Sequence, residues 1–277
     1  MSYAHSKNKD KKDSFKHISE YDKRELSLLN LQVKIALIYM ISDIFLFEGT
    51  IESINLSCNK EKAYTNPFIL LGQGQVLALI ASVLISYVDF SRYDQLSKRE
   101  DKRKKSIEPE YLISQASILT IILYVLNIIA VNEQYKASLI IDFLECDKKN
   151  INILYLQAYA FLIRFYGDYF WLRAILKSID LIRSKYDKRI KNIYNPDIDA
   201  VIAAELYVIQ RGVLYDIGCY TLVHLINEGS DINKELLLPA QNILVIADIF
   251  GVVANITVLG AFIKIYARNE NEPVFGR

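Results

Sequence analysis

The sequence predicts an all-α fold, a polytopic membrane helical bundle with about six transmembrane helices and polar interior seams. Three observations lead to this prediction. Apolar residues gather in runs of about 20, which is the length that a helix needs to cross a bilayer. Lys and Arg gather between these runs, whereas a soluble helical protein interleaves them at a period of about 3.6. Gly and Pro number only 10 and 5, which favours long helices over a fold with many turns.

The apolar runs divide the chain into a polar N-terminal tail, 1–30, a transmembrane helical bundle, 31–266, and a polar C-terminal tail, 267–277. The first run is short, the fourth and fifth contain several charged residues, and the other three are strongly apolar. In chain order the predicted spans are 31–47, 68–88, 112–131, 153–172, 200–226 and 242–263.

The positions of proline and glycine predict where some of these helices start and where two helices pack closely. Pro109, Pro196 and Pro239 stand just ahead of spans and are predicted to mark helix starts, where the missing N–H costs a helix little. The segment GQGQ, 72–75, lies in an apolar span and lacks the lysine of a phosphate-binding loop. Its glycines are therefore predicted to allow close helix packing, and the segment is a weaker candidate for lining a pore.

Basic residues alternate in abundance between the spans, and this alternation predicts the topology. With six spans, 24 of the 33 Lys and Arg residues fall on one side of the membrane, 6 on the other and three within spans. Because Lys and Arg collect on the cytoplasmic or matrix side, both termini are predicted to lie there, in a bacterial inner membrane or an organellar membrane. A model with four spans and a large domain over 132–241 is less economical.

Each predicted span carries one line of polar or small side chains at helical spacing, here called a polar seam. Such a seam is poorly suited to lipid, so it is predicted to face other helices in a bundle with a polar interior. The predicted seams are Gln32, Tyr39 and Asp43; Gln75, Ser82, Ser86 and Asp89; Ser117, Thr120, Tyr124 and Asn127; Gln157, Phe161, Arg164, Asp168 and Trp171; Glu205, Gly212, Asp216 and Tyr220; and Gln241, Asp248 and Asn255.

Charged residues within the spans are the candidate functional residues, because ionisable groups inside membranes often mark ion paths and proton relays. Arg164 and Arg211 are the intramembrane charge partners, and Arg164 and Asp168 stand four residues apart, so they are predicted to pair along one helix face. The alternative is that every such charge is simply paired or protonated within the bundle. The candidates for an ion or proton pathway are Asp43, Asp168, Glu205, Asp216 and Asp248.

Two functions fit this pattern. The first is movement of a proton or small cation through the acid-rich interior. The second is a non-catalytic accessory subunit, or a pore-forming component, whose polar seams and charged tails dock other membrane-protein subunits or further copies of the chain. The expected surroundings are membrane lipids, and a net charge of +1 gives no reason to expect a nucleic acid partner.

Catalytic and metal-binding patterns are absent from the sequence. It contains no HExxH, GxSxG or P-loop motif, so no enzyme activity and no cofactor are expected. Three widely spaced cysteines and three scattered histidines give no metal-site spacing. Cys58 and Cys146 fall in predicted loops on the same side, where an oxidising compartment would permit a disulfide.

Overall fold

The computed structural model describes residues 18–58, 66–98, 106–140, 148–187, 190 and 195–269, and every regular element within them is α-helical. This confirms the predicted all-α bundle. The helices are α2 (Glu20–Cys58), α3 (Pro67–Ser97), α4 (Glu108–Ser138), α5 (Lys148–Ser184), α6 (Pro196–Glu228) and α7 (Asp231–Arg268).

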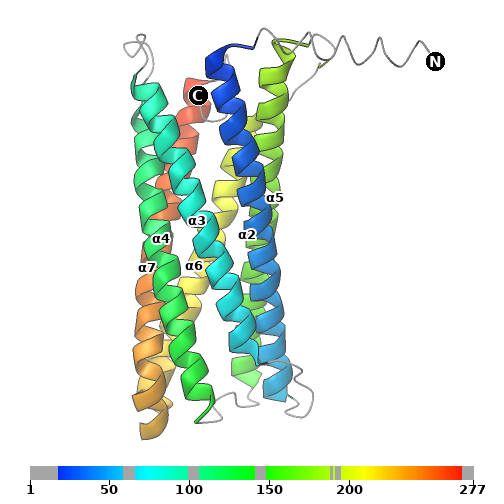
Figure 1. The fold of residues 1–277 in the computed structure, drawn as a ribbon. Helices are drawn as coiled ribbons and strands as arrows, with labels where there is room; N and C mark the ends of the chain where they lie inside the picture. The colour runs from blue at the N-terminus through cyan, green and yellow to red at the C-terminus, as the bar shows by residue number, and fades with distance from the viewer. Residues whose placement is uncertain are drawn as a thin grey trace, which may run out of the picture.

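The six helices form a closed ring around a central interior. Each helix packs on two neighbours, in the order α2, α3, α4, α7, α6, α5 and back to α2. Successive helices run in opposite directions, so the start of α2 and the end of α7 lie at the same end of the bundle (Figure 1). None of the described helices lies at the centre of the ring, and the polar side chains of several helices therefore meet inside it.

The helices are longer than the apolar runs within them. They contain 31 to 39 residues, or roughly 46 to 58 Å at 1.5 Å per residue, against about 30 Å of hydrocarbon in a bilayer. Helix α2 begins at Glu20, inside the segment 1–30 that the sequence assigns to a polar tail, while residues 1–17 and 270–277 lie outside the described part of the chain. Four helices, α2, α3, α4 and α7, are long and apolar enough to cross a membrane.

Capping residues and prolines fix several helix starts. Pro196 occupies the first turn of α6, and the side chain of Asn195 accepts a hydrogen bond from the backbone N–H of Asp197, as expected for an N-cap. Pro109 likewise lies in the first turn of α4. The prediction for Pro239 is wrong, because Pro239 lies inside α7, which already begins at Asp231. Ser230 caps α7 there, so a polar turn overrides the proline signal.

Polar and aromatic contacts join every pair of neighbouring helices at the end where α2 begins. Several ion pairs there cross between helices, and Tyr93 and Tyr111 join α3 to α4 through a ring contact at 5.6 Å. At the opposite end, the ion pairs among the described residues lie within single helices. The other contacts of the first end are Glu25–Arg92, Glu110–Arg268, Asp197–Asn269, Asp199 with Arg173 and Lys177, and Asp22 with Lys185 and Tyr186.

Gly74 lies where α3 packs tightly on α2, in agreement with the packing prediction for the segment 72–75. The Ser42 hydroxyl donates a hydrogen bond to the Gly74 carbonyl at 2.8 Å. A β-carbon on Gly74 would lie 2.8 Å from the Cγ and Cδ2 atoms of Leu46, which is too close without a shift of the helices. The same segment contributes Gln75 to the interior.

We expect Gly74→Ala to lower the free energy of unfolding in detergent by about 1–3 kcal/mol, because the added methyl group overpacks the contact of α3 with α2. Gly72→Ala is the matched control, since its nearest neighbour, Val131 Cγ1, would be 3.8 Å away. Chemical denaturation of both variants measures the difference. Equal unfolding midpoints for the two would contradict the close packing at Gly74.

Candidate functional site

Two cavities lie inside the ring and meet at the same pair of arginines. The small cavity has a volume of about 150 Å³ and lies toward the end of the bundle where α2 begins. Gln32 and Asp89 are among the residues that line it. The large cavity, about 510 Å³, extends to Gly229 at the opposite end. Arg164 and Arg211 line both cavities. These arginines and three aspartates form what we call the charged layer: Arg164, Arg211, Asp43, Asp168 and Asp248.

Arg164 pairs across the ring rather than along its own helix. Its Nε lies 3.0 Å from Oδ1 of Asp43 on α2, and both side chains are buried, with 5% and 1% of their surface exposed. The guanidinium also lies over the rings of Tyr39 and Tyr124, at 5.3 and 5.4 Å from their centroids. The ion pair of Arg164 is thus with Asp43 on a neighbouring helix, while the predicted partner Asp168 lies close enough for an attraction between the two charges.

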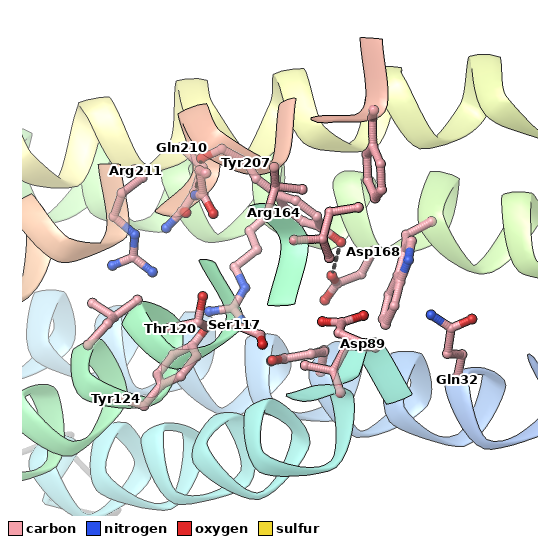
Figure 2. A pocket seen from close by; sticks show the side chains of 18 of the residues that line it. Gln32, Asp89, Ser117, Thr120, Tyr124, Arg164, Asp168, Tyr207, Gln210 and Arg211 are labelled. Carbon is pink, nitrogen blue, oxygen red and sulfur yellow. Dashed lines mark hydrogen bonds between the residues drawn. The ribbon is translucent and has the colours of Figure 1, made fainter. Parts of the chain in front are cut away.

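Asp168 instead accepts a hydrogen bond from the hydroxyl of Tyr207 on α6, shown as a dashed line in Figure 2. Gly167 makes this possible, because a β-carbon there would lie 2.7 Å from Cε1 of Tyr207. The glycine in the segment FYGD thus lets the Tyr207 ring pack against α5. Asp168 points into the small cavity together with Arg164 and Tyr207 (Figure 2).

The carboxyl groups of Asp43 and Asp168 are close enough to share a hydrogen bond. Both oxygens of Asp43, and Oδ2 of Asp168, are buried and accept no hydrogen bond from any described donor. A buried acceptor without a donor is costly, and two carboxyl groups in contact are poorly able to ionise together. A proton shared by the two carboxyl groups would supply a donor to these oxygens.

Arg211 and Asp248 form the second ion pair of the charged layer and join α6 to α7. Nη1 of Arg211 donates to Oδ1 of Asp248 at 2.9 Å. The arginine lies across Gly251, where a β-carbon would be 2.6 Å from its Cδ. On either side of Asp248, Gln241 donates to the Gly218 carbonyl and Asn255 donates to the Tyr207 carbonyl, both at 2.9 Å. The predicted seam of the last span therefore does face the interior.

Polar seams from four other helices also reach the interior. Their members line the two cavities or are buried beside them, which confirms the predicted polar interior for these helices. These residues are Gln32, Tyr39 and Asp43 of α2; Gln75, Ser82, Ser86 and Asp89 of α3; Ser117, Thr120, Tyr124 and Asn127 of α4; and Gln157, Phe161, Arg164, Asp168 and Trp171 of α5.

The predicted seam of α6 faces the wrong way. Glu205 and Asp216 are exposed on the outside of the ring, and Gly212 has no neighbour within 4 Å. Arg211 takes the inward position because Asp248 lies there. At 100° per residue, Arg211 is more than 100° away from both carboxylates around the helix, so the three residues cannot share one face.

Sequence reasoning missed two interior residues of α6, Tyr207 and Gln210. Both line the small cavity, and Gln210 is 1% exposed. Tyr207 stands four residues before Arg211, so the two residues share one helix face. A prediction that turned Arg211 toward the interior would therefore have placed Tyr207 there as well.

Burial also affects an acidic group outside the predicted spans. In the first turn of α6, burial raises the pKa of Asp197 to about 6, against the opposing effects of the Asn269 hydrogen bond and the Arg268 charge. Asp197 belongs to the set of contacts that joins the helices at this end of the ring.

Among the described residues, no group of three or more His, Cys, Asp and Glu side chains is placed to hold a metal ion. Cys58 lies exposed at the end of α2, and Cys146, its predicted partner, lies outside the described residues. No family model, curated protein or solved structure matches this chain. Any proposal about function therefore rests on the arrangement of the side chains in this structure.

Proposed function

We propose that this membrane protein moves protons across the bilayer along the interior of the ring. The observation that supports this most strongly is that two cavities approach the charged layer from opposite ends, and that both have Arg164 and Arg211 in their walls. Polar groups reach the layer from each end, and ionisable groups occupy the layer itself. In a membrane this is the arrangement that a proton relay requires.

The relay passes through Asp168 and Asp43. A proton entering the small cavity reaches Asp168, which also holds the Tyr207 hydroxyl. It passes to the neighbouring carboxyl group of Asp43, and the Arg164 guanidinium, 3.0 Å from Asp43, stabilises the Asp43 carboxylate once this group has released the proton. Asp43 then gives the proton to a water molecule beside Arg164, which also lines the large cavity, and the proton leaves through that cavity. The direction reverses when the gradient reverses.

The two arginines favour a proton over a bare metal cation. A sodium or potassium ion passing between the cavities would approach two buried guanidinium groups, at a repulsive energy that a low dielectric enlarges. A proton moves by exchange between neighbouring carboxyl and water groups and never has to stand as a free cation beside them. Of the proton and small cation that the sequence allows, the geometry therefore supports the proton.

This proposal implies that all six helices cross the membrane. Arg164 and Asp168 point inward from α5, while between residues 153 and 176 the exposed side chains of this helix are uncharged: Tyr155, Leu156, Tyr159, Leu162, Tyr166, Tyr169 and Leu176. The outer face of α5 is thus suited to lipid despite its two interior charges. By the distribution of Lys and Arg, the end of the ring that holds both described termini faces the cytoplasm or matrix.

Purified protein in liposomes tests the proposal. With a potassium diffusion potential and a pH-sensitive dye inside, we expect proton uptake into vesicles that contain the protein and none into empty vesicles. Asp168→Asn and Asp43→Asn should each abolish this uptake, because an amide keeps the shape but neither accepts nor donates an exchangeable proton.

Asp216→Asn is the matched control, since it makes the same chemical change on the outer face of α6. Its uptake should equal that of the wild type. Full uptake by Asp43→Asn and Asp168→Asn, or equal loss in all three variants, would show that the charged layer is not the path.

The outer face of α6 favours a second candidate function, membership in a larger membrane assembly. Two exposed carboxylates, Glu205 and Asp216, lie on a helix within the ring, where lipid would disfavour each of them by about 2.5–3.5 kcal/mol. A neighbouring chain packed along α6 would remove this cost. The mass of the particle extracted in mild detergent decides the matter: a mass of one chain plus detergent excludes a stable assembly.

A further inference from the structure

An open groove lies on the outer surface of the ring, between the start of α2 and the end of α5. These two helices pack side by side (Figure 1). Three basic residues line the groove, Lys23 and Lys34 of α2 and Arg183 of α5, and no described carboxylate lines it. The side chains of all three are exposed. The groove therefore carries an excess of positive charge, which favours an anion as its occupant.

One of these basic residues has an acidic partner among the described residues. Nζ of Lys23 lies 2.6 Å from Oε1 of Glu20, which stands one turn earlier on α2. Lys34 and Arg183 form no ion pair with any described residue. Asp180 of α5 is exposed one turn before Arg183, but it does not line the groove. Two positive charges thus remain for an occupant to neutralise.

Lys34 places this groove at the boundary of the membrane. The residue lies inside the first predicted span, 31–47, on a helix that is long and apolar enough to cross a bilayer. Its exposed side chain shares one face of α2 with Leu37, Ile41 and Ile44, each of which is nearly half exposed. A cation beside hydrocarbon is disfavoured unless it reaches the headgroups or an anion. An anionic headgroup in the groove would remove this cost.

The antiparallel packing of α2 and α5 brings the two unpaired cations closer together in depth. Arg183 stands two residues before Lys185, whose Nζ lies 3.2 Å from Oδ1 of Asp22 at the start of α2. By this register Lys34 lies about 15 Å deeper than Arg183, at 1.5 Å per residue. Side chains lean toward the N-terminus of their own helix. Because the two helices run in opposite directions, the side chains of Lys34 and Arg183 lean toward each other.

We propose that this groove binds the headgroup of one anionic phospholipid, whose acyl chains lie along the apolar part of the same face of α2. Lys34 and Arg183 hold the phosphate. Ser27 and Asn30 are exposed in the groove between the levels of these two cations and donate hydrogen bonds to phosphate oxygens. Basic pockets between membrane helices are suited to such headgroups. The site requires neither the charged layer nor proton movement, so it goes beyond the proposed function.

Native mass spectrometry of the full chain in detergent tests the site. Phosphatidylglycerol and phosphatidylcholine with identical acyl chains are added in equal amounts, and the fraction of protein that carries each lipid is measured as their concentration rises. We expect phosphatidylglycerol to bind about tenfold or more tightly than phosphatidylcholine, because only the former carries a net negative charge. An excess of inorganic phosphate should not displace it, since free phosphate has no acyl chains to bury.

The double variant Lys34→Gln with Arg183→Gln should bind phosphatidylglycerol about 25-fold more weakly, since each basic residue near a membrane surface contributes about fivefold. Lys34→Gln alone should lose about fivefold. Arg24→Gln with Lys98→Gln is the matched control: it removes the same charge from exposed positions at the same end of the ring, and neither residue lines the groove. The control should bind as the wild type does.

The melting temperature with phosphatidylcholine alone should be the same for the wild type and all variants, because every substituted side chain is exposed. Three results would overturn the proposal: equal binding of the two lipids, a preference for phosphatidylglycerol that the groove double variant retains, and equal losses in the two double variants, which would indicate general attraction to a basic surface. Displacement by inorganic phosphate would overturn it as well. Failure of the proton pathway would leave these results unchanged, because no substituted residue belongs to the charged layer.

Discussion

Replacing Arg164 with methionine is expected to lower the free energy of unfolding by about 3–5 kcal/mol. The guanidinium is 5% exposed and lies 3.0 Å from the Asp43 carboxylate, which is 1% exposed. Removing the arginine takes the ion-pair partner away from Asp43, which also interacts with Asp168, and leaves only the more distant Arg211, which is already paired with Asp248. It also removes the packing of the guanidinium on Tyr39 and Tyr124. Denaturant unfolding in detergent, followed by circular dichroism, measures the loss.

A second variant separates the charge effect from general damage. The double change Arg164→Met with Asp43→Leu removes both members of the pair, and it should recover most of the lost stability because Asp43 is no longer left as a buried charge without its arginine, while Asp168 keeps its hydrogen bond from Tyr207. Arg173→Met is the control on the same helix. Arg173 is 42% exposed, and Lys177 remains on its partner Asp199, so the expected loss is below about 1 kcal/mol. Equal losses for Arg164→Met and Arg173→Met would refute the buried pair.

Replacing Gly251 with alanine should have the largest effect on transport that a single added methyl group can produce here. The β-carbon would lie 2.6 Å from Cδ and 2.7 Å from Nε of Arg211. Arg211 has little freedom to move aside, because it is 3% exposed and bound to Asp248. We expect the displaced guanidinium to leave Asp248, and proton uptake into liposomes to fall by about tenfold or more.

Gly260 offers the matched comparison on the same helix. It has no neighbour within 4 Å, so alanine there adds the same methyl group without a contact. Gly260→Ala should transport and unfold like the wild type, while Gly251→Ala should also lose about 1–3 kcal/mol of stability from overpacking. Wild-type uptake by Gly251→Ala would mean that the position of Arg211 does not matter for transport.

The sequence predicts the interior well wherever a helix has one polar face. On α7, Gln241, Asp248 and Asn255 recur at intervals of seven residues on an otherwise apolar helix, so the inward face is unambiguous, and all three reach the interior. On α5 the stripe that contains Arg164 and Asp168 is equally clear. Helical periodicity is a local property, and local sequence is sufficient to reveal it.

Contacts between different helices cannot be predicted from this local periodicity. The pairing of Arg164 with Asp43 depends on which helices are neighbours in the ring, and spacing along one helix can only propose Asp168. The same limit explains α6, which has polar residues on two faces. Local pattern cannot choose between Arg211 and the pair Glu205 and Asp216, because the choice is made by Asp248 on α7. Pro239 shows a third case, in which a cap at Ser230 starts the helix earlier than the proline implies.

The short connection between α6 and α7, Gly229 and Ser230, has a consequence for biosynthesis. Helix α6 leaves the ribosome first, with Arg211 still lacking the Asp248 that neutralises it. Alone, such a segment is a poor substrate for the insertion machinery. Its strongly apolar successor follows after two residues and brings the missing countercharge, so the two helices are expected to enter the bilayer as one hairpin.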